Sequence, residues 1–442
     1  MKITVVGAGK SGVSAALLAK KLGHSVLLTE KGAKEKFSSS IPLLEEYGIQ
    51  YEFGGHSDGV LLNSELVITS PGVPPNSDVI RSAEIRRIPI VSEVEFASQH
   101  ISNPIVAITG TNGKTTTTAL TQWLFQTAGI PSIACGNIGV PMSQLIVDGL
   151  DASTWLIVET SSYQLDRIST FSPRISAMLN ITPDHLSYHG TMFEYSKAKH
   201  RIYAYQQLNA DYIYNLDDVS TYPKNDIRPQ VSAFSLKTES EFGIFADEMK
   251  LYFTENGSRI HCILRSELGL PGIHNCYNSM AAALIARKAG ISVASIAKGL
   301  QTFQGVEHRL EFVRELQGVR YINDSKATNV DSTKYALTSY DAPIIWIAGG
   351  RGDNNDYDIL TEEITNNVRT IIAIGEESDA IAAHFKRLNV KQCVNLEDAV
   401  NYATSIAKAD EVVLFSPACK SFDMFSNYEE RGMIFKQIVN SL

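Results

Sequence analysis

A loop rich in glycine, lysine and threonine follows the predicted strand 104–109 and opens a predicted helix. Glycines allow a tight turn whose N–H groups point at phosphate oxygens, and the helix offers its positive end to the same group. Lys114 is placed to reach the β- and γ-phosphates of a nucleotide, and Thr115 to bind Mg²⁺. The loop therefore predicts ATP–Mg²⁺ binding by Gly110, Thr111, Asn112, Gly113, Lys114, Thr115 and Thr116.

The spacing of this loop departs from the standard phosphate loop, in which four residues separate the glycines. Here two residues separate Gly110 from Gly113, and Ile108 stands where the first glycine would be. An ordinary glycine turn is the alternative, but the preceding strand and the Gly-Lys-Thr sequence disfavour it. We expect a variant phosphate loop.

A second glycine loop, Gly7-Ala8-Gly9-Lys10-Ser11-Gly12, follows a predicted strand at 3–6. It matches the dinucleotide fingerprint only in part, because Gly12 falls one position early. Glu30 ends the next predicted strand, where an acid that binds ribose would lie. From these residues alone, an NAD or FAD site, another diphosphate ligand and a structural turn all remain open.

Acidic residues and a histidine follow two further predicted strands. Glu159 ends the strand 155–159, and Asp184 and His185 come shortly after the strand 175–180. Carboxylates at strand ends beside a phosphate loop are well placed to bind Mg²⁺. The basic segment 197–201 lies on a predicted helix, and its ordinary interpretation is a solvated face.

Strands and helices alternate along the chain, which predicts parallel sheets covered on both faces. We expect an α/β fold of three domains, each built on a mainly parallel sheet: a Rossmann-like domain over 1–98, a central domain with the phosphate loop over 99–305, and a Rossmann-like domain over 306–442. Short alternating runs between 215 and 265 predict hairpins in the central domain. Further strands are expected at 319–323, 344–348, 370–374 and 411–415.

The composition narrows the class of protein. The chain has 442 residues and a net charge of −9, without a lysine- and arginine-rich run, so nucleic acid is not an expected partner. Five cysteines without a CxxC pair favour a reduced protein over a disulfide framework or zinc site. No apolar run reaches the ~18–20 residues of a membrane span, and the first residues are typical of a strand. We expect a cytoplasmic protein without a membrane partner.

Several short motifs occur together, and in this combination the whole chain resembles the Mur ligase superfamily. They are the loop 109–115, Gly136-Asn137-Ile138-Gly139, Glu159-Thr160-Ser161-Ser162, Asn180-x4-His185, Lys199-x-Arg201-Ile202-Tyr203, His274-Asn275-x2-Asn278, Glu307-His308-Arg309 and Asn323-Asp324-Ser325-Lys326-Ala327-Thr328-Asn329. Three motifs are similar to the D-glutamate-adding branch in particular: Gly136-Asn137-Ile138-Gly139, the motif at 323–329 and Ser416-Pro417-Ala418-Cys419.

The resemblance implies an ATP-dependent amide ligase of cytoplasmic peptidoglycan precursor synthesis. Such a ligase joins D-glutamate to UDP-N-acetylmuramoyl-L-alanine: the substrate carboxylate attacks the γ-phosphate, and the amine then displaces phosphate from the acyl phosphate. The resemblance also implies two Mg²⁺ ions and closure of the last domain on the substrates. We expect a monomer.

The family roles carry over residue by residue. Thr115 and Glu159 resemble ligands of the first Mg²⁺, and His185 and Lys199 resemble groups at the second, where the family lysine is carbamylated by CO₂. Lys114, Glu159, His185 and Lys199 are the implied catalytic residues. Further ATP contacts are implied for Asn275, Asn278, Arg309 and Asp324; contacts to the UDP substrate for Ser11, Glu30, Ser70, Gly72, Asn137 and Ser161; and contacts to the amino acid for Lys326, Thr328, Lys420, Ser421 and Phe422.

One position departs from the family pattern. A Gly-Gly-x-x-Lys sequence commonly supplies a lysine for the incoming glutamate, but here Asp353 occupies that place. An acid there would repel the glutamate side chain, so we expect Arg351 or Lys420 to compensate, with a changed amino-acid specificity as the alternative. Two readings outside this branch remain, an NAD-dependent oxidoreductase and a non-catalytic nucleotide-binding regulator, besides a related ligase such as a folylpolyglutamate synthase.

Overall fold

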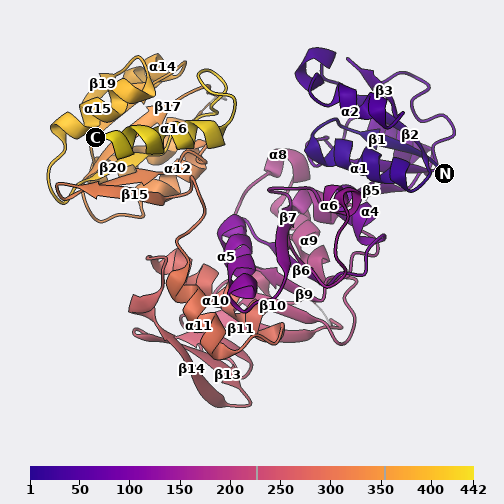
Figure 1. The fold of residues 1–442 in the computed structure, drawn as a ribbon, viewed down its shortest axis with the longest axis horizontal. Helices are drawn as coiled ribbons and strands as arrows, with labels where there is room; N and C mark the ends of the chain where they lie inside the picture. The colour runs from indigo at the N-terminus through magenta and orange to yellow at the C-terminus, as the bar shows by residue number, and fades with distance from the viewer. Residues whose placement is uncertain (225–226, 353–354) are drawn as a thin grey trace. The chain divides into compact units, whose positions relative to one another are not determined.

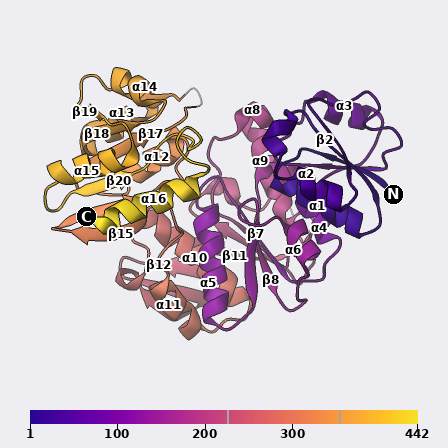
Figure 2. The same ribbon diagram turned by 45° about the horizontal axis from the view of Figure 1, so that its top comes forward.

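The structure is a computed structural model that describes residues 1–224, 227–352 and 355–442. The chain divides into two compact units, Met1–Phe303 and Gln304–Leu442. Three sheets run through it, two in the first unit and one in the second (Figure 1). Helices cover the faces of each sheet, as the second view also shows (Figure 2). The prediction of three α/β domains on mainly parallel sheets is confirmed.

The N-terminal sheet is entirely parallel, with the strand order β3-β2-β1-β4-β5. Gly12 opens helix α1 against the turn after β1, where a Cβ would come within 1.9 Å of the Gly7 carbonyl oxygen, so only glycine allows this approach. The elements are β1 Lys2–Val6, α1 Lys10–Lys21, β2 Ser25–Glu30, α2 Ile41–Glu46, β3 Gln50–Phe53, β4 Leu66–Thr69, α3 Asp78–Ile85, β5 Ile90–Ser92 and α4 Glu93–Ser98.

The central sheet has nine strands in the order β14-β13-β12-β11-β10-β9-β6-β8-β7. Strands β12, β13 and β14 form the expected hairpins, and the other strands of this sheet pair in parallel. Its strands are β6 Ile105–Thr109, β7 Ser132–Gly136, β8 Trp155–Glu159, β9 Ile175–Met178, β10 Asp211–Asn215, β11 Gln230–Ser235, β12 Gly243–Ala246, β13 Lys250–Glu255 and β14 Ser258–Leu264. Its helices are α5 Lys114–Thr127, α6 Met142–Asp148, α7 Ser162–Asp166, α8 Leu186–His189, α9 Met192–His200, α10 Ile273–Lys288 and α11 Val293–Thr302.

The second unit has one sheet of order β15-β16-β20-β17-β18-β19, parallel except for β15. Buried apolar side chains lie on both faces of this sheet, as expected for strands enclosed between two layers of helices. The elements are β15 Glu311–Leu316, β16 Val319–Asn323, α12 Val330–Leu337, β17 Ile344–Gly349, α13 Thr361–Asn367, β18 Val368–Ile374, α14 Ser378–His384, β19 Val390–Gln392, α15 Leu396–Ile406, β20 Val412–Phe415 and α16 Tyr428–Ser441.

Strand order places the predicted ligand loops. In each sheet, strands from different parts of the chain flank one inner strand: β1 lies between β2 and β4, β6 between β8 and β9, and β20 between β16 and β17. Ligands of open α/β sheets bind beyond the carboxyl ends of the strands at such a point. The first glycine loop follows β1, the phosphate loop follows β6, and the segment 416–422 follows β20.

Helix α4 carries two buried glutamates with different surroundings. Glu93 accepts one hydrogen bond, from Ser143 N at 2.6 Å, while its Oε2 is buried and has no partner among the described residues. Burial therefore raises the pKa of Glu93 above its ordinary value of 4.5. Burial acts in the same direction on Glu95, but hydrogen bonds from Thr170 and its neighbours outweigh it and lower the pKa of that carboxyl.

Glu93→Gln and Glu95→Gln should have opposite pH signatures. A raised pKa in the folded state means that the contribution of Glu93 to the free energy of unfolding falls as pH rises above about 4.5. Glu93→Gln should therefore gain stability relative to wild type as pH rises above that value. Glu95 contributes above its unfolded pKa, so Glu95→Gln should lose about 2 kcal/mol or more at about pH 8 and less near about pH 4. Thermal unfolding of both variants over this pH range tests the pair. Parallel pH profiles for the two variants would contradict the assignment.

Candidate active site

The phosphate loop is held between β6, α5 and the start of α10. Gly113 precedes α5 with a positive φ of 83°, and a Cβ there would lie 2.3 Å from Asn278 Oδ1. Thr117 of α5 donates to the same oxygen at 3.3 Å, and Asn278 donates to Asn275 Oδ1 at 3.3 Å. The structure thus brings the two asparagines predicted to contact ATP beside the loop.

Two lysines converge on one carbonyl oxygen of this loop. Gly110 O accepts from Lys114 Nζ at 2.9 Å and from Lys199 Nζ at 2.7 Å. Lys199 is 1% exposed, and its ammonium lies 4.8 Å from the centre of the Tyr195 ring. Burial, and then the charge of Lys114, lower the pKa of Lys199 well below its ordinary value. The solvated basic face expected from composition applies to Lys197, which pairs with Glu194, and is wrong for Lys199.

Glu159 lies at the end of β8 and is 2% exposed. Its Oε1 accepts from Asn137 Nδ2 at 3.0 Å, and its Oε2 is buried without a partner among the described residues. A buried carboxylate oxygen without a donor is suited to a cation. In the described part of the chain, no cluster of three or more histidine, cysteine and acidic side chains is arranged to hold a metal. Glu159 would therefore need ligands of other types, such as the hydroxyl of Thr115 in the first turn of α5.

His185 precedes α8 and has a left-handed backbone, with φ 54°. Asp184 Oδ2 lies 3.3 Å from His185 Nε2, and Asp184 Oδ1 accepts from His185 N at 2.8 Å. Partial burial lowers the pKa of His185; Asp184 opposes this shift, while Lys114 and Lys199 add to it. The imidazole is thus neutral at neutral pH and belongs to the same electrostatic cluster as the two lysines.

The first glycine loop is closed by residues from two other strands. Glu30 Oε2 accepts from Ala8 N at 2.9 Å, and Ser70 donates to Gly7 O at 3.2 Å. Ser11 is half-buried in the first turn of α1, and Gly72 is exposed in the segment after β4. These four predicted UDP-substrate residues gather at the carboxyl ends of β1, β2 and β4.

The other two residues predicted for this substrate lie in the central domain. Asn137, exposed, follows β7 and donates from its backbone to Glu159 O at 2.8 Å. Ser161 caps α7, where its side chain accepts from Gln164 N at 3.3 Å. Both are therefore next to Glu159 along the edge of the sheet.

In the second unit, Asp324 is buried at the end of β16. It accepts from Ser416 Oγ at 2.7 Å and from Leu310 N at 3.2 Å, next to Arg309 in sequence. Burial raises the pKa of Asp324 to about 7, with hydrogen bonding by Ser416 and the charge of Arg309 opposing the shift. Lys326 and Thr328 follow on the same segment, with the Lys326 ammonium 5.7 Å from the centre of the Tyr428 ring.

The segment after β20 lies beside the segment after β17. Arg351 N donates to Lys420 O at 2.9 Å, and Lys420 N donates to Arg351 O at 3.0 Å. Ser421 is buried and Phe422 is 60% exposed. The Arg351 guanidinium forms a bidentate ion pair with Glu376, at 3.0 and 2.8 Å. Asp353 lies outside the described residues.

The sequence did not single out Tyr195 or the contact between Ser162 and His189. Tyr195 OH lies 3.0 Å from Thr111 Oγ1, and His189 Nε2 lies 2.9 Å from Ser162 Oγ. Tyr195 could have been found, because it precedes Lys199 by four residues and so shares its helix face. The contact between Ser162 and His189 joins segments after two different strands and has no local signal.

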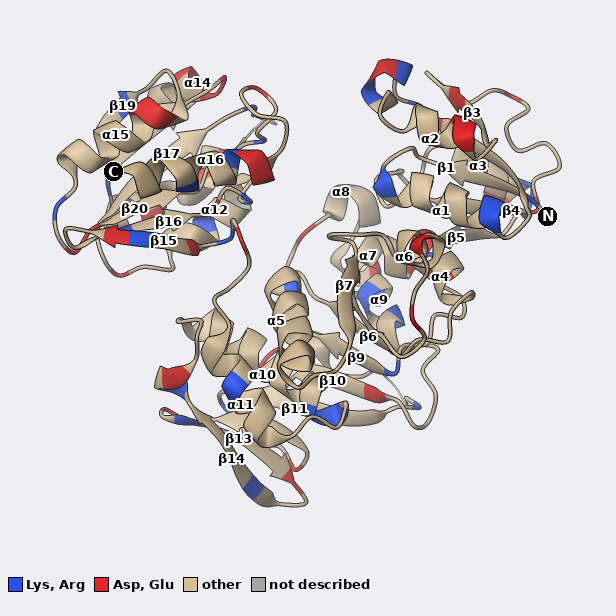
Figure 3. Ribbon diagram, in the orientation of Figure 1, with Lys and Arg blue, Asp and Glu red and all other residues tan. Residues whose placement is uncertain are grey.

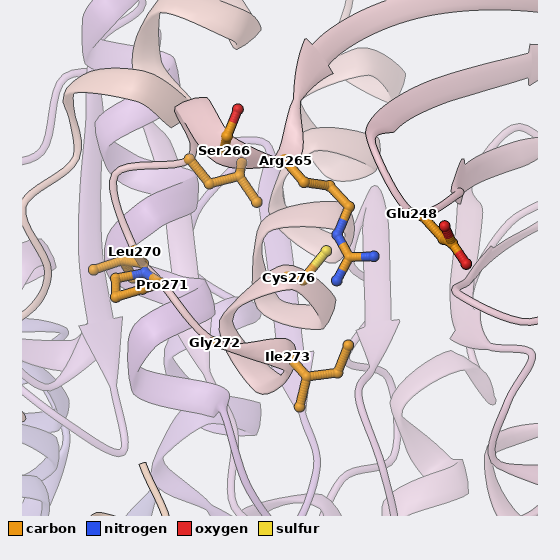
Figure 4. Close-up of a pocket in the computed structure, with 9 residues that line it drawn as sticks. Glu248, Arg265, Ser266, Leu270, Pro271, Gly272, Ile273 and Cys276 are labelled. Atoms are coloured by element: carbon orange, nitrogen blue, oxygen red, sulfur yellow. The ribbon is translucent and has the colours of Figure 1, made fainter. Parts of the chain in front are cut away.

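A separate pocket lies where the turn after β14 meets the start of α10 (Figure 4). The side chains of Arg265 and Cys276 face each other across it, and the segment 270–273 forms another side. None of the residues predicted to bind ATP lines this pocket. Along the helices, strands and loops, basic and acidic residues are interspersed (Figure 3). Among the described residues, no helix has both the length and the apolar character needed to cross a membrane.

Three family models match consecutive parts of the chain. They describe a Mur ligase MurD-like N-terminal domain over residues 1–92, a Mur ligase middle domain over 108–286 and a Mur ligase glutamate ligase domain over 308–419. The middle-domain match contains the phosphate loop, Glu159, His185 and Lys199.

Curated relatives match along the full chain. The UDP-N-acetylmuramoylalanine–D-glutamate ligase of Salinibacter ruber is 40% identical, with 100% of this chain and 98% of the relative covered. The ligase of the same name from Pelotomaculum thermopropionicum is 39% identical, with the same coverage.

Solved structures of related ligases share the fold. The UDP-N-acetylmuramate–alanine ligase of Thermotoga maritima has a TM-score of 0.58 at 19% identity, covering 100% of this chain and 99% of that one. The MurF ligase of the same organism, solved with ADP, has a TM-score of 0.57 at 16% identity, covering 94% and 95%. With full-length identity of 40% to a curated member, the chain belongs to the Mur ligase family, in its UDP-N-acetylmuramoylalanine–D-glutamate ligase branch.

Proposed function

We propose that the protein joins D-glutamate to UDP-N-acetylmuramoyl-L-alanine and converts ATP to ADP and phosphate. The observation that carries this proposal is the cluster of Lys114, Lys199, Glu159 and His185 around the variant phosphate loop. It combines cations for phosphate oxygens with a buried acceptor for a metal. The full-length similarity to curated ligases of that name supports the choice of substrates.

The reaction has two steps that need different help from the chain. First, an oxygen of the substrate carboxylate attacks the γ-phosphorus and ADP leaves; Lys114 stabilises the negative charge on the transferring group. Second, the amine nitrogen of D-glutamate attacks the acyl carbon and phosphate leaves, taking both electrons of its bond to carbon, while the nitrogen gives up a proton to solvent. Both steps depend on holding two reactants in line, and exclusion of water protects the acyl phosphate from hydrolysis.

Mg²⁺ fits the residues present, because Glu159 Oε2 is a buried acceptor without a donor and Thr115 lies in the first turn of α5. We assign these two residues to one ion and His185 with a modified Lys199 to a second. When bound, Mg²⁺ supplies charge neutralisation on the phosphate oxygens.

Lys199 is suited to modification by CO₂. Carbamylation requires the neutral amine, and burial lowers the pKa of Lys199 well below its ordinary value, which increases the fraction of this form. The nitrogen attacks the carbon of CO₂ and loses a proton, which converts the buried neutral amine into an anion. We propose that Lys199 carries this carbamate in the active enzyme.

The domain boundaries, the remaining ligand contacts and the oligomeric state are proposed by similarity to the Mur ligase family. We propose domain boundaries after residues 98 and 305, ATP contacts by Arg309 and Asp324, UDP-substrate contacts by Ser11, Glu30, Ser70, Gly72, Asn137 and Ser161, and a monomer acting in the cytoplasm. The last domain is proposed to close on the substrates.

Phosphate release should require ATP, Mg²⁺, UDP-N-acetylmuramoyl-L-alanine and D-glutamate together. Phosphate release should be abolished when any one of these components is left out. Lys114→Ala should lower kcat about hundredfold or more, because it removes charge stabilisation of the transferring phosphoryl group. A coupled phosphate assay with each component omitted in turn measures this. Release without D-glutamate, or binding of NAD instead of the UDP substrate, would refute the proposal.

Lys199→Ala should be inactive and partly rescued by a short carboxylate such as acetate, because the carboxylate replaces the lost anion. Lys197→Ala, two residues away and exposed, is the matched control and should keep near wild-type activity without a response to acetate. Wild-type activity should also fall when bicarbonate is removed. An equal increase in the activity of both variants on addition of acetate argues against the carbamate. So does a Lys199→Ala variant that acetate does not rescue, if wild-type activity also stays the same when bicarbonate is removed.

We propose that Lys420 or Arg351 supplies the positive charge for the glutamate side chain. Because each substitution removes one of these charges, we expect at least one of Lys420→Ala and Arg351→Ala to raise KM for D-glutamate about tenfold. Steady-state kinetics with D-glutamate varied at saturating ATP test this. If neither variant raises KM, the compensation idea fails, and a panel of acidic and basic amino acids should then reveal a changed specificity.

A further inference from the structure

Arg431 is a fully buried charged residue at the start of α16. It is 0% exposed, and its guanidinium donates three hydrogen bonds to uncharged acceptors. Nε donates to Ser325 Oγ at 3.0 Å, Nη2 to Ser325 O at 2.7 Å, and Nη1 to Cys419 O at 3.1 Å. Among the residues that the structure describes, no carboxylate forms an ion pair with it within 4.0 Å.

The side chain remains a cation under ordinary conditions. Burial lowers the pKa of Arg431 to about 10, while the Cys419 thiol and the carboxylates of Asp423 and Asp324 oppose the shift from a distance. A buried cation without a direct counterion is uncommon, because removal of a charge from water is unfavourable unless an opposite charge compensates it.

The position of Arg431 links it to the predicted amino-acid site. Ser325 directly precedes Lys326 in the segment after β16, and Cys419 directly precedes Lys420 in the segment after β20. A Cβ on Gly350, after β17, would lie 3.2 Å from Nη1 of the same guanidinium. One side chain therefore joins the segments after β16 and β20 and lies beside the segment after β17.

A purely structural role does not account for the charge. The two carbonyl groups need hydrogen-bond donors, but neutral donors could satisfy them without the unfavourable burial of a cation. A missing counterion that arrives with the substrate accounts for both features, because the incoming amino acid is expected to be acidic.

We propose that Arg431 is a positioning and specificity-determining residue for the incoming acidic amino acid. Its hydrogen bonds fix the segments that carry Lys326 and Lys420 relative to each other, and its charge favours an anionic ligand between them. This inference rests on the proposed function, since the amino-acid site belongs to it.

The test compares Arg431→Met, which removes the charge, with Arg431→Lys, which keeps it. Phe435→Leu is the matched structural control, because Phe435 is equally buried one turn later in α16 and touches Phe415 rather than the two segments. We expect Arg431→Met to raise KM for D-glutamate about tenfold or more, while KM for ATP stays within about twofold. Arg431→Lys should recover most of that loss. Phe435→Leu should lower the thermal midpoint without a selective change in KM.

Two outcomes for Arg431→Met would overturn the inference. One is an equal increase in KM for all three substrates together with a loss of stability like that of Phe435→Leu. The other is an unchanged KM for D-glutamate. If Arg431→Met does not fold, Ser325→Ala decides, because it keeps the charge and removes one of the hydrogen bonds of Arg431. It should raise KM for D-glutamate several-fold, and an unchanged value would reject the positioning role. A wild-type enzyme that releases no phosphate with the full set of substrates would instead reject the proposed function.

Discussion

Two amino groups that meet at a single carbonyl oxygen set the constraint around which the first unit is arranged. The distances from Gly110 O to Lys114 Nζ and Lys199 Nζ are 2.9 and 2.7 Å. Two ammonium groups this close repel each other, and burial increases that repulsion because little water screens it. The arrangement is favoured when one amine is neutral or when anions lie nearby, and the lowered pKa of Lys199 acts in the first of these directions. The same positive field is what phosphate groups need, so the local electrostatic strain and the proposed chemistry have one origin.

The rest of the molecule holds such groups at defined places by strand order. Lys199 belongs to α9, and Tyr195 of the same helix makes a second contact with the loop, through Thr111. Glu159 is held by Asn137 from the neighbouring strand end. In the second unit Arg431 plays a comparable part by joining the segments after β16 and β20. In each case a side chain from one segment of the chain forms hydrogen bonds with a residue at the carboxyl end of a different strand.

Much of this could be predicted from the sequence, because local patterns carry it. The phosphate loop follows a strand and opens a helix, and Glu159 ends another strand. Glycines, the period of the hydrophobic residues and the ends of apolar runs are local signals of all these features. Short strands were harder: β19 spans three residues of which two are exposed, so it lacks an apolar run. The burial of Lys199 and Arg431 could not be read from composition, since lysine and arginine are usually exposed and only tertiary packing encloses them. Family resemblance identified Lys199, while Arg431 became visible only through its contacts.

The strand order of the second unit has a consequence for the growing chain on the ribosome. Strand β20 is the last strand in sequence, yet it occupies an inner position between β16 and β17. Until it emerges, β16 and β17 have no common neighbour, and each exposes an unpaired edge. This sheet therefore cannot be completed progressively during synthesis, and its contacts are of long sequence separation, which slows folding. Nascent chains that stop short of residue 412 should be the forms of this protein most in need of chaperone protection.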